Sequence, residues 1–471
     1  MSESKMVAGM PAEEFRKAGH ELIDWIAGYL GDIRDYPVLP SVQPGEIAAK
    51  LPASAPERGE SMDAILEDFR NLILPGVTHW NHPRFHGYFS ISGSAPGILA
   101  ESLAAALNVN AMLWKACPSA TELEQVVLGW LREWVGLPDN FFGIVYDTAS
   151  ISTMHAIAAA REQAAPESRL EGTPAGLVMY TSEQAHNSVE KAAIALGIGH
   201  RNVRKVPVDE CFRMRPEVLR QMVEQDLAGG KKPFCVVATA GTTSTTSIDP
   251  VPAIADIAER HGLWLHIDGA YGGTAAIVPE FRHVLAGAER ADSIVINPHK
   301  WLFTPVDFSA FYTRRPEVLR RAFSLAAEYL KTGEDSRAVN LMDYGLQLGR
   351  RFRALKLWFI LRYFGRQRVI EILRSHIGWA REFASWVEAD PRFELAAPVP
   401  LALVCFRYRG SDQQNQRLLE GINASGQAFL SHTVLNGRFA LRMAVGNVAT
   451  RRDDIELVWS LVQARAAALE S

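Results

Sequence analysis

Cysteine is scarce in this chain of 471 residues, and the four present, Cys117, Cys211, Cys235 and Cys405, form no CxxC pair. This spacing excludes a disulfide framework and a cysteine-based metal site, and it is typical of a protein from a reducing compartment. An excess of positive charge is also missing, because 49 Lys and Arg face 53 Asp and Glu, a net charge of −4. A basic nucleic-acid-binding surface is therefore not expected.

Long apolar runs are missing as well. The best candidate, around residues 103–114, is interrupted by asparagine and falls short of the roughly 20 apolar residues that a membrane-spanning helix needs. The N-terminal sequence MSESKMVAGM has an acidic residue where a signal peptide would have a basic region. We therefore expect a soluble, cytoplasmic protein with neither a membrane nor a nucleic acid as its partner.

The hydrophobic pattern divides the chain into three parts. Residues 1–85 combine two helical stretches with a proline-rich passage, which predicts a helical and extended dimerisation arm. Over residues 86–350 the runs GLVMY, FCVVATAG, GLWLHIDGAY, SIVINPHKW and DFSAFYT alternate with helical stretches. This alternation predicts a large α/β domain whose mostly parallel central sheet has helices on both faces. Residues 351–471 are expected to form a small C-terminal α+β domain.

Polar residues directly follow three of the predicted strands. The run LWLHID ends in Asp268, which small residues follow, and SIVI leads into Asn297, His299 and Lys300. The run VVATAG leads into a stretch of hydroxyl residues that includes Thr243. Ligands of parallel α/β sheets bind at the carboxyl ends of the strands, so these side chains are candidates for one site. A lysine in such apolar surroundings has a lowered pKa and becomes nucleophilic.

These residue types together match the needs of pyridoxal phosphate. The cofactor requires an amine for a Schiff base, an acid beside its ring nitrogen and an anion site for its phosphate, which Lys300, Asp268 and a helix N-terminus would supply. The candidate helix begins at Ala149 and Ser150, where free backbone N–H groups can bind an anion. His186 precedes another helix, from where its imidazole could lie flat on the pyridine ring.

Each of these residues has a simpler interpretation when taken alone. Asp268 could cap a helix, Lys300 could be a solvated lysine, and His186 could be a surface histidine. Their combination outweighs these alternatives. A zinc site at His79, His82 and His86 is disfavoured because the spacing is that of a loop with an intervening proline and without a fourth ligand, and no metal is expected.

The sequence resembles the pyridoxal-phosphate-dependent group II amino acid decarboxylases, specifically the aromatic L-amino acid decarboxylases, which include aromatic aldehyde synthases. The resemblance covers nearly the whole chain, and its most specific part is NPHKW with HIDGAY upstream. Other matching segments are PGVTHW, TASISTMHAIAAAR, QAHNSVEKAA, GTTSTTSIDP, LGRRFRALKLWF and RFALRMAVG. The resemblance implies the fold-type I transferase architecture, a homodimer and decarboxylation of Phe, Tyr, DOPA or Trp to the arylalkylamine and CO2.

The resemblance also implies roles for single residues. Lys300 would form the Schiff base, Asp268 would pair with the pyridinium nitrogen, and His186 would stack on the ring and contact the substrate. Ala270 would pack near the ring. The residues implied to hold the phosphate and the lysine-bound cofactor are Ala149, Ser150, Thr243, Asn297 and His299. The residues implied to contact an aromatic substrate are Trp80, Tyr88, Phe89, Ile91, Met112, His186 and Gly349.

One position departs from the family pattern. Many relatives carry a tyrosine in the loop before LGRRF that returns a proton to Cα, and counting back without a gap places Leu341 there, with Tyr329 and Tyr344 nearby. Loss of this tyrosine would divert the reaction to O2, so oxidative deamination to the aromatic acetaldehyde is an alternative. A less favoured alternative is an aminotransferase of the same fold that grips the substrate carboxylate with Arg442, and a non-catalytic scaffold is a third.

Overall fold

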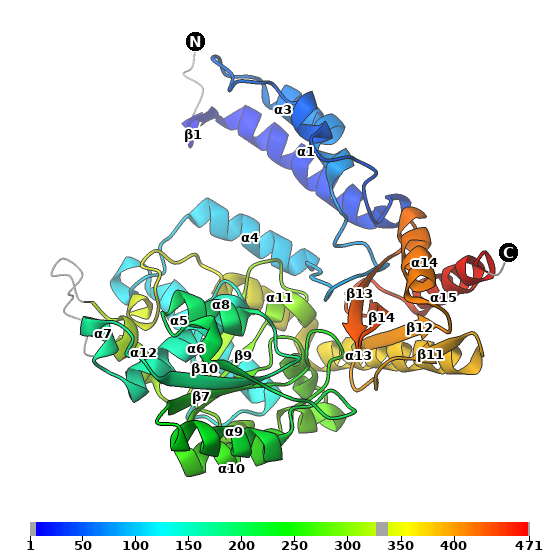
Figure 1. The fold of residues 1–471 in the computed structure, drawn as a ribbon. Helices are drawn as coiled ribbons and strands as arrows, with labels where there is room; N and C mark the ends of the chain where they lie inside the picture. Colours follow the sequence, from blue (N-terminus) through cyan, green and yellow to red (C-terminus); the bar gives the residue numbers. More distant parts are fainter. Residues whose placement is uncertain (1–5, 326–337, 470–471) are drawn as a thin grey trace.

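The computed structural model describes residues 6–325 and 338–469, which form an arm, a large α/β part and a smaller α+β part (Figure 1). The α/β part with a mostly parallel sheet confirms the predicted fold class. The predicted boundary at residues 85 and 86 falls inside strand β3 (Phe85–His86), which pairs with the sheet of the small part. We therefore propose that the arm ends before β3.

The large part contains a seven-stranded sheet with the strand order β4-β10-β9-β8-β7-β5-β6. Five neighbouring strands, β9, β8, β7, β5 and β6, are parallel, while β10 runs antiparallel to both β4 and β9. The strands are β4 (Phe142–Tyr146), β5 (Leu177–Ser182), β6 (Val203–Val206), β7 (Lys232–Thr239), β8 (Trp264–Asp268), β9 (Ser293–Ile296) and β10 (Ser309–Thr313). Nearly all their residues are buried, as expected for a sheet that is covered on both faces.

Two groups of helices cover the sheet. Successive strand residues point to opposite faces, so Ile144 packs in one apolar cluster and Val145 in the other. One cluster contains side chains of α6 (Ala149–Ala164), α8 (Ser188–Ala195) and α12 (Pro316–Phe323). The other contains side chains of α5 (Pro118–Val135), α9 (Pro216–Ala228) and α10 (Val251–His261). Short helices α7 (Ser168–Glu171) and α11 (Pro298–Trp301) lie in connections.

The small part is built on a five-stranded sheet with the order β11-β12-β14-β13-β3. Its strands, besides β3, are β11 (Phe393–Leu395), β12 (Leu403–Tyr408), β13 (Phe429–Leu435) and β14 (Arg438–Ala444). Its helices are α13 (Ala354–Ala389), α14 (Asp412–Ala424) and α15 (Arg452–Ala467). The long helix α13 also packs on α4 (Ala95–Leu107) and α5, so it joins the two parts.

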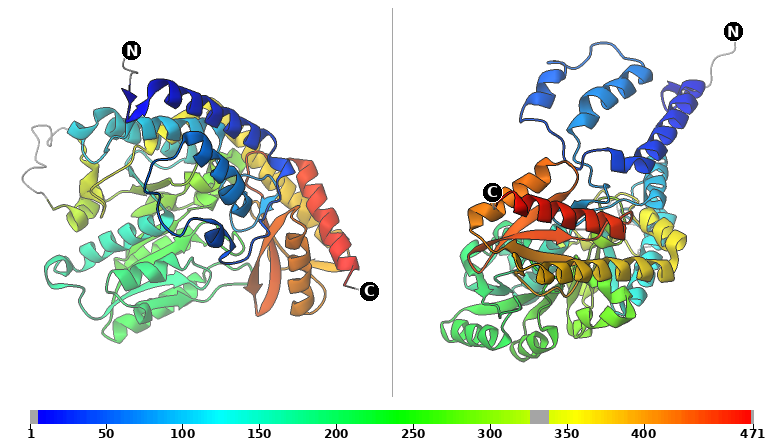
Figure 2. Two further views of the ribbon diagram at one scale, coloured as in Figure 1. Left: turned by 90° about the horizontal axis from the view of Figure 1, so that it is seen from above. Right: turned by 90° about the vertical axis from the view of Figure 1, so that its right-hand side faces the viewer.

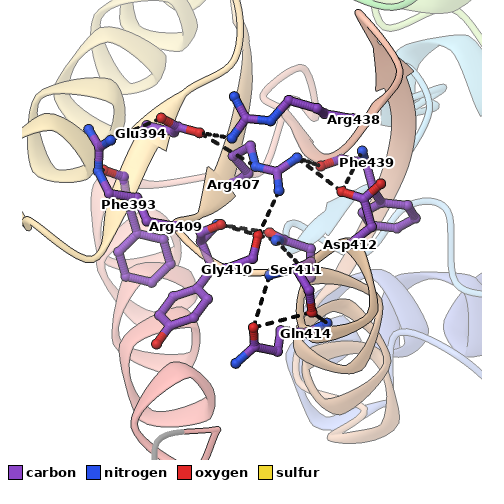
Figure 3. Close-up of polar contacts among 12 residues, drawn as sticks. Phe393, Glu394, Arg407, Arg409, Gly410, Ser411, Asp412, Gln414, Arg438 and Phe439 are labelled. Carbon is purple, nitrogen blue, oxygen red and sulfur yellow. Dashed lines mark hydrogen bonds and ion pairs between the residues drawn. The ribbon is translucent and has the colours of Figure 1, made fainter.

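A buried arginine ties the elements of the small part together (Figure 3). Arg407 on β12 is only 4% exposed, and its guanidinium donates to the carbonyls of Phe439 and Gly410 and pairs with Asp412 at 3.1 Å. Glu394 on β11 lies on the other side of Arg407. Strands β11, β12 and β14 and the start of α14 thus share one charged hub, whose donors are largely satisfied despite burial.

The arm projects from the body of the molecule (Figures 1 and 2). It contains β1 (Met6–Val7), β2 (Met10–Pro11), α1 (Ala12–Gly31), α2 (Glu46–Lys50) and α3 (Met62–Asp68). No residue of α1 is buried, and even its apolar side chains are exposed: Phe15 is 55% exposed and Ile23 is 46% exposed. The arm is fixed at its base by the ion pair between Arg34 and Asp454 at 2.7 Å. An exposed apolar helix face of this kind is typical of a surface that a partner covers.

In the described residues, no helix is both long enough and apolar enough to cross a membrane.

Candidate active site

A cavity of about 150 Å³ lies at the carboxyl ends of the parallel strands. Segments that follow five different strands contribute to it, as the sequence pattern predicts for this architecture. Its lining residues are Phe89, Thr148, Ala149, Ser150, His186, Thr239, Gly241, Thr243, Asp268, Ala270, Tyr271, Asn297, His299 and Lys300. Every residue that we predicted to bind the cofactor is therefore in one cavity, and two predicted substrate residues, Phe89 and His186, are there as well.

Lys300 lies on the single helical turn α11, which follows β9 directly. Its Nζ atom lies 5.4 Å from the centre of the Phe89 ring. Burial lowers the pKa of the Lys300 ammonium, and the nearby Asp268 carboxylate opposes this shift only in part. A lowered pKa increases the fraction of neutral amine, which is the nucleophilic form.

Asp268 is the last residue of β8 and is 7% exposed. One carboxylate oxygen, Oδ1, accepts a hydrogen bond from the backbone N–H of Ala270 at 3.1 Å. The loop beyond β7 comes very close to the segment after Asp268, because a Cβ at Gly241 would lie 2.9 Å from the backbone nitrogen of Gly272. Gly241 also has a φ of +97°, so glycine is required there for both reasons. The crossing keeps the surroundings of Asp268 compact.

The opposite end of the cavity presents N–H groups. Helix α6 starts there with Ala149 and Ser150, and no side chain caps its first turn. The amide oxygen of Asn297 accepts from Ser309 Oγ at 2.6 Å, so the Asn297 NH2 group points toward His299 Nε2, 3.3 Å away. His299 Nδ1 accepts from the backbone N–H of Phe308 at 2.9 Å, which leaves the proton of the neutral ring on Nε2. The Asn297 amide and the His299 ring therefore line the cavity side by side, and N–H groups of this kind suit a bound anion.

His186 approaches from the loop between β5 and α8. Its Nδ1 accepts from the backbone N–H of Ser188 at 3.2 Å and contacts Ser188 Oγ at 2.9 Å, which fixes the imidazole and places the proton of the neutral ring on Nε2. Burial lowers the pKa of His186, and the charge of Lys300 lowers it further. A neutral, fixed imidazole can both stack on a ring and donate from Nε2.

Sequence reasoning missed three lining residues as binding candidates: Thr239, Gly241 and Tyr271. Tyr271 follows Ala270 in the same motif, so its position next to Asp268 and Ala270 was the available signal. Its ring is stacked on Phe89 with centroids 3.9 Å apart. The hydroxyls of Tyr271 and Thr239 are buried and have no hydrogen-bond partner within residues 6–325 and 338–469. Both hydroxyls are thus available to a ligand.

Most of the predicted substrate residues lie elsewhere in the single chain. Tyr88 is 54% exposed, stacks on Trp80 at 5.7 Å and lines a neighbouring cavity that also includes Thr243. Met112 lies on the segment that contacts residues 340–350, since its carbonyl accepts from the N–H of Met342. Gly349 is exposed beside Asn110 of that same segment. Neither Met112 nor Gly349 lines the Lys300 cavity, and Ile91 does not line it either.

Leu341 is not a pocket or loop-tip residue. It begins a 3₁₀ turn (Leu341–Tyr344), is 0% exposed and belongs to the apolar cluster of α6 and α12. Tyr344 packs against Phe142 and its carbonyl accepts from the Tyr146 hydroxyl, so it is held in the same core. Tyr329 lies outside the described residues. The ungapped count that assigned the loop position to Leu341 therefore placed it on a core residue, and this assignment is corrected.

The histidines of the loop over residues 79–86 are buried. Among residues 6–325 and 338–469, no three His, Cys, Asp or Glu residues are arranged to hold a metal ion. His79 Nδ1 bonds the Tyr29 hydroxyl at 2.8 Å, and His86 Nδ1 bonds the carbonyl of Ala444 at 3.0 Å. His79 thus ties α1 to the end of the arm, and His86 joins β3 to β14 within the small sheet.

Comparison with known proteins identifies the family of the chain. The sequence model of the pyridoxal-dependent decarboxylase conserved domain matches residues 44–409. The chain is 39% identical to an aromatic-L-amino-acid decarboxylase of Catharanthus roseus, with 96% of this chain and 94% of the relative covered. This chain belongs to the pyridoxal-dependent decarboxylase family. It belongs to the group II branch that contains the aromatic amino acid decarboxylases and the aldehyde synthases.

Two further comparisons describe the range of this decarboxylase family. A phenylacetaldehyde synthase of Arabidopsis thaliana is 38% identical over 99% of this chain and 98% of its own length. The crystal structure of Oryza sativa TDC with PLP and tryptamine superposes with a TM-score of 0.95 at 35% identity, covering 99% of this chain and 100% of that one. The family and the fold are thus established, and the relatives include both decarboxylases and an aldehyde synthase.

The residues of the cavity fit pyridoxal phosphate, the cofactor of this family. The polar N–H groups of Asn297 and His299, with the start of α6, match a phosphate group. The Asp268 carboxylate has an oxygen left for a protonated ring nitrogen, and Lys300 supplies the amine. The small residue Ala270, 4% exposed, leaves room beside Asp268 for a flat ring.

Proposed function

We propose that this decarboxylase converts aromatic L-amino acids of the Phe, Tyr, DOPA and Trp type to the corresponding arylalkylamines and CO2. The observation that carries the proposal is the presence of Lys300, Asp268 and His186 in one cavity whose wall includes Phe89. An aromatic wall and relatives that act on aromatic amino acids support an aromatic side chain on the substrate. The substrate panel described below tests this activity.

The roles of the residues follow from their surroundings. When bound, pyridoxal phosphate supplies the electron sink for the carbanion that loss of CO2 leaves. We propose that Lys300, with its lowered pKa, provides the neutral amine that anchors the cofactor. Asp268 would keep a proton on the ring nitrogen by pairing with it, as a nearby carboxylate favours the charged form. His186 would cover the ring and donate a hydrogen bond from Nε2 to the substrate, while α6, Thr243, Asn297 and His299 hold the phosphate.

The aminotransferase alternative is weakened by the contacts of Arg442. Its guanidinium donates to the carbonyls of Ser244 at 3.0 Å and Thr243 at 2.5 Å, and to Ser431 Oγ at 2.9 Å. Arg442 is 4% exposed, so these contacts use the donors that a substrate carboxylate would need. Arg442 therefore acts as a support for the Thr243 loop.

A substrate panel with complete product analysis tests the proposed reaction. With Phe, Tyr, DOPA and Trp, we expect amine and CO2 in equal amounts, without peroxide, and no turnover of glutamate as a non-aromatic control. Aldehyde and peroxide in place of amine would instead identify oxidative deamination, which also requires O2. A keto acid without CO2 would identify an aminotransferase and contradict the proposal.

We further propose that the enzyme is a homodimer. We also propose that it works in the cytoplasm, which is a reducing compartment. Three leucines on one stripe of α4, Leu99, Leu103 and Leu107, are 51%, 48% and 57% exposed, and the apolar side of α1 is exposed as well. A second copy would cover both surfaces, and Met112 and Gly349 could then complete the partner's substrate pocket. The cysteines within the described residues carry free thiols, in agreement with a reducing compartment.

The dimer proposal predicts that a charge on the α4 stripe dissociates the protein. Leu103→Glu is expected to shift the sedimentation coefficient to that of a monomer and to lower kcat/KM at least about tenfold, since a buried unpaired carboxylate costs several kcal/mol. Leu170→Glu is the matched control, because Leu170 on α7 is 89% exposed and away from α4. A dimeric, fully active Leu103→Glu variant would contradict the proposal.

A further inference from the structure

A stack of aromatic rings runs from the cavity into the interior beside Lys300. Phe89, which faces the Lys300 amine, stacks on Tyr271, and Tyr271 stacks on Trp301 with centroids 4.6 Å apart and planes 7° from parallel. Trp301 follows Lys300 directly and is the last residue of the α11 turn. Because the two residues are neighbours in one turn, the position of the Trp301 ring affects the position of the Lys300 backbone, from which the lysine side chain extends.

The indole N–H of Trp301 is bound by His376 of α13. Trp301 Nε1 donates to His376 Nδ1 at 3.1 Å, and the side chains are 0% and 1% exposed. The ring of His376 also bonds the backbone of Asn447, which can accept only from Nε2–H, so Nδ1 is left as the acceptor. Burial lowers the pKa of His376 to about 3, which keeps this acceptor unprotonated at working pH.

Apolar packing alone does not account for a histidine at this position. The centre of the His376 ring lies 6.2 Å from that of Phe303 and 5.8 Å from that of Trp379. In these surroundings, burying an apolar side chain would cost less free energy than burying an imidazole. The imidazole provides what an apolar residue cannot, an acceptor for a buried indole N–H. Without that acceptor the indole would carry an unsatisfied donor in the core and would gain by moving.

We propose that His376 is a positioning residue for Lys300 and acts through the hydrogen bond to Trp301. The bond holds the indole in the stack, the stack holds the α11 turn, and the turn sets the reach and the surroundings of the lysine amine among Asp268, His186 and His299. Because α13 also packs against the small sheet, this bond makes that helix part of the support of the cofactor site. The inference rests on the proposed role of Lys300 in anchoring the cofactor.

The test compares variants of the holoenzyme that remove either partner of the bond. His376→Leu removes the acceptor, His376→Gln keeps an amide oxygen that can accept and an NH2 that can donate, and Trp301→Phe removes the donor. The first measurement is the pH titration of the visible absorbance of the lysine-bound cofactor, which needs no substrate. The second is kcat and KM, and thermal unfolding checks that each variant is folded.

We expect His376→Leu to shift the titration midpoint by about half a pH unit or more and to lower kcat about tenfold with KM almost unchanged, while His376→Gln restores both. Trp301→Phe and the double variant W301F/H376L should share one midpoint, since the acceptor has no partner once the indole is gone. A His376→Leu enzyme that only unfolds at lower temperature, with midpoint and kcat unchanged, would overturn the inference.

Two further measurements distinguish a failure of the proposed role of His376 from a variant that does not fold and from a failure of the proposed role of Lys300. If His376→Leu does not fold, Trp301→Phe and W301F/H376Q carry the same comparison, and a tenfold difference in kcat between these two would overturn the inference. If the wild-type enzyme with added pyridoxal phosphate develops no visible absorbance, the proposed role of Lys300 fails, whatever His376 does.

Discussion

Replacing Lys300 with alanine is expected to lower decarboxylation at least about a thousandfold and to abolish the visible absorbance of the bound cofactor. The physical reason is the position of the amine: it is the nucleophile of the cavity, its pKa is lowered by burial, and no second lysine among residues 6–325 and 338–469 lines the cavity. The measurement is CO2 release with each aromatic substrate, together with an absorbance spectrum of the protein after addition of pyridoxal phosphate.

Lys300→Arg is the matched control for this result. A guanidinium retains the positive charge beside Asp268 but stays protonated and cannot act as the nucleophile. Lys300→Arg should therefore be as inactive as Lys300→Ala, while both unfold at temperatures close to that of the wild type. If either variant kept a tenth of the wild-type rate, Lys300 would not be the anchoring residue.

The second large effect is a steep loss of stability in mild acid. Burial lowers the pKa of six histidines well below the ordinary value of 6.5. These are His82, His299 and His376, with a pKa of about 3, and His86, His155 and His266, with a pKa of about 4. Between pH 6.5 and 4 the unfolded chain binds protons at these sites and the native protein does not. The free energy of unfolding therefore falls as the pH falls, by up to about 1.4 kcal/mol per pH unit and histidine.

Two carboxyl groups act in the opposite direction, because burial raises the pKa of Asp292 as well as that of Asp249. Burial raises the pKa of Asp249 to about 6, so the native protein binds a proton there that the unfolded chain takes up only near its ordinary value of 3.8. This gain offsets about one of the six histidines between pH 6 and 4. The net effect remains a loss of several kcal/mol per pH unit, and unfolding in urea should shift to much lower concentrations at pH 5.5 than at pH 7.5.

His82→Asn is the variant that assigns this effect. His82 is 0% exposed and its Nδ1 accepts from the backbone N–H of Arg84 at 3.0 Å, a bond that an asparagine oxygen can replace in an Asx turn. The variant should show a pH dependence that is weaker by about one proton. If the urea midpoint of the wild type is the same at pH 7.5 and 5.5, the six buried histidines do not stay neutral in the native protein, and the prediction is wrong.

The cofactor end of the site was predictable because it depends on a rule of architecture. Polar residues after apolar runs mark strand ends, and parallel strands end at one edge, so Asp268, Thr243 and Lys300 were expected to meet, and they line one cavity. Tyr271 and Gly241 were missed because their parts depend on packing. An unpartnered hydroxyl and a close backbone crossing are properties of the folded chain, which no local pattern encodes.

The substrate end could not be predicted in the same way. Met112 and Gly349 came from the family resemblance, and neither lines the Lys300 cavity of the single chain, so their part in the site rests on the proposed dimer. The error at Leu341 has a different cause. Counting residues through a segment without periodicity assumes that loop lengths are equal, and one gap moves the count from a loop position to a core position. Burial, and not spacing, identifies what Leu341 does.

The strand order of the large sheet has a consequence for how the enzyme is made. Strand β4 is synthesised before the other strands of this sheet, but within the part of the chain that the structure describes it pairs only with β10, at residues 309–313. A nascent chain that has not yet emerged from the ribosome to Thr313 therefore cannot dock β4, and α6, which follows β4, cannot present its N-terminus to Lys300. We conclude that the phosphate site is complete only after β10 has emerged, since shorter nascent chains offer Thr243, Asn297 and His299 without the N-terminus of α6 in place.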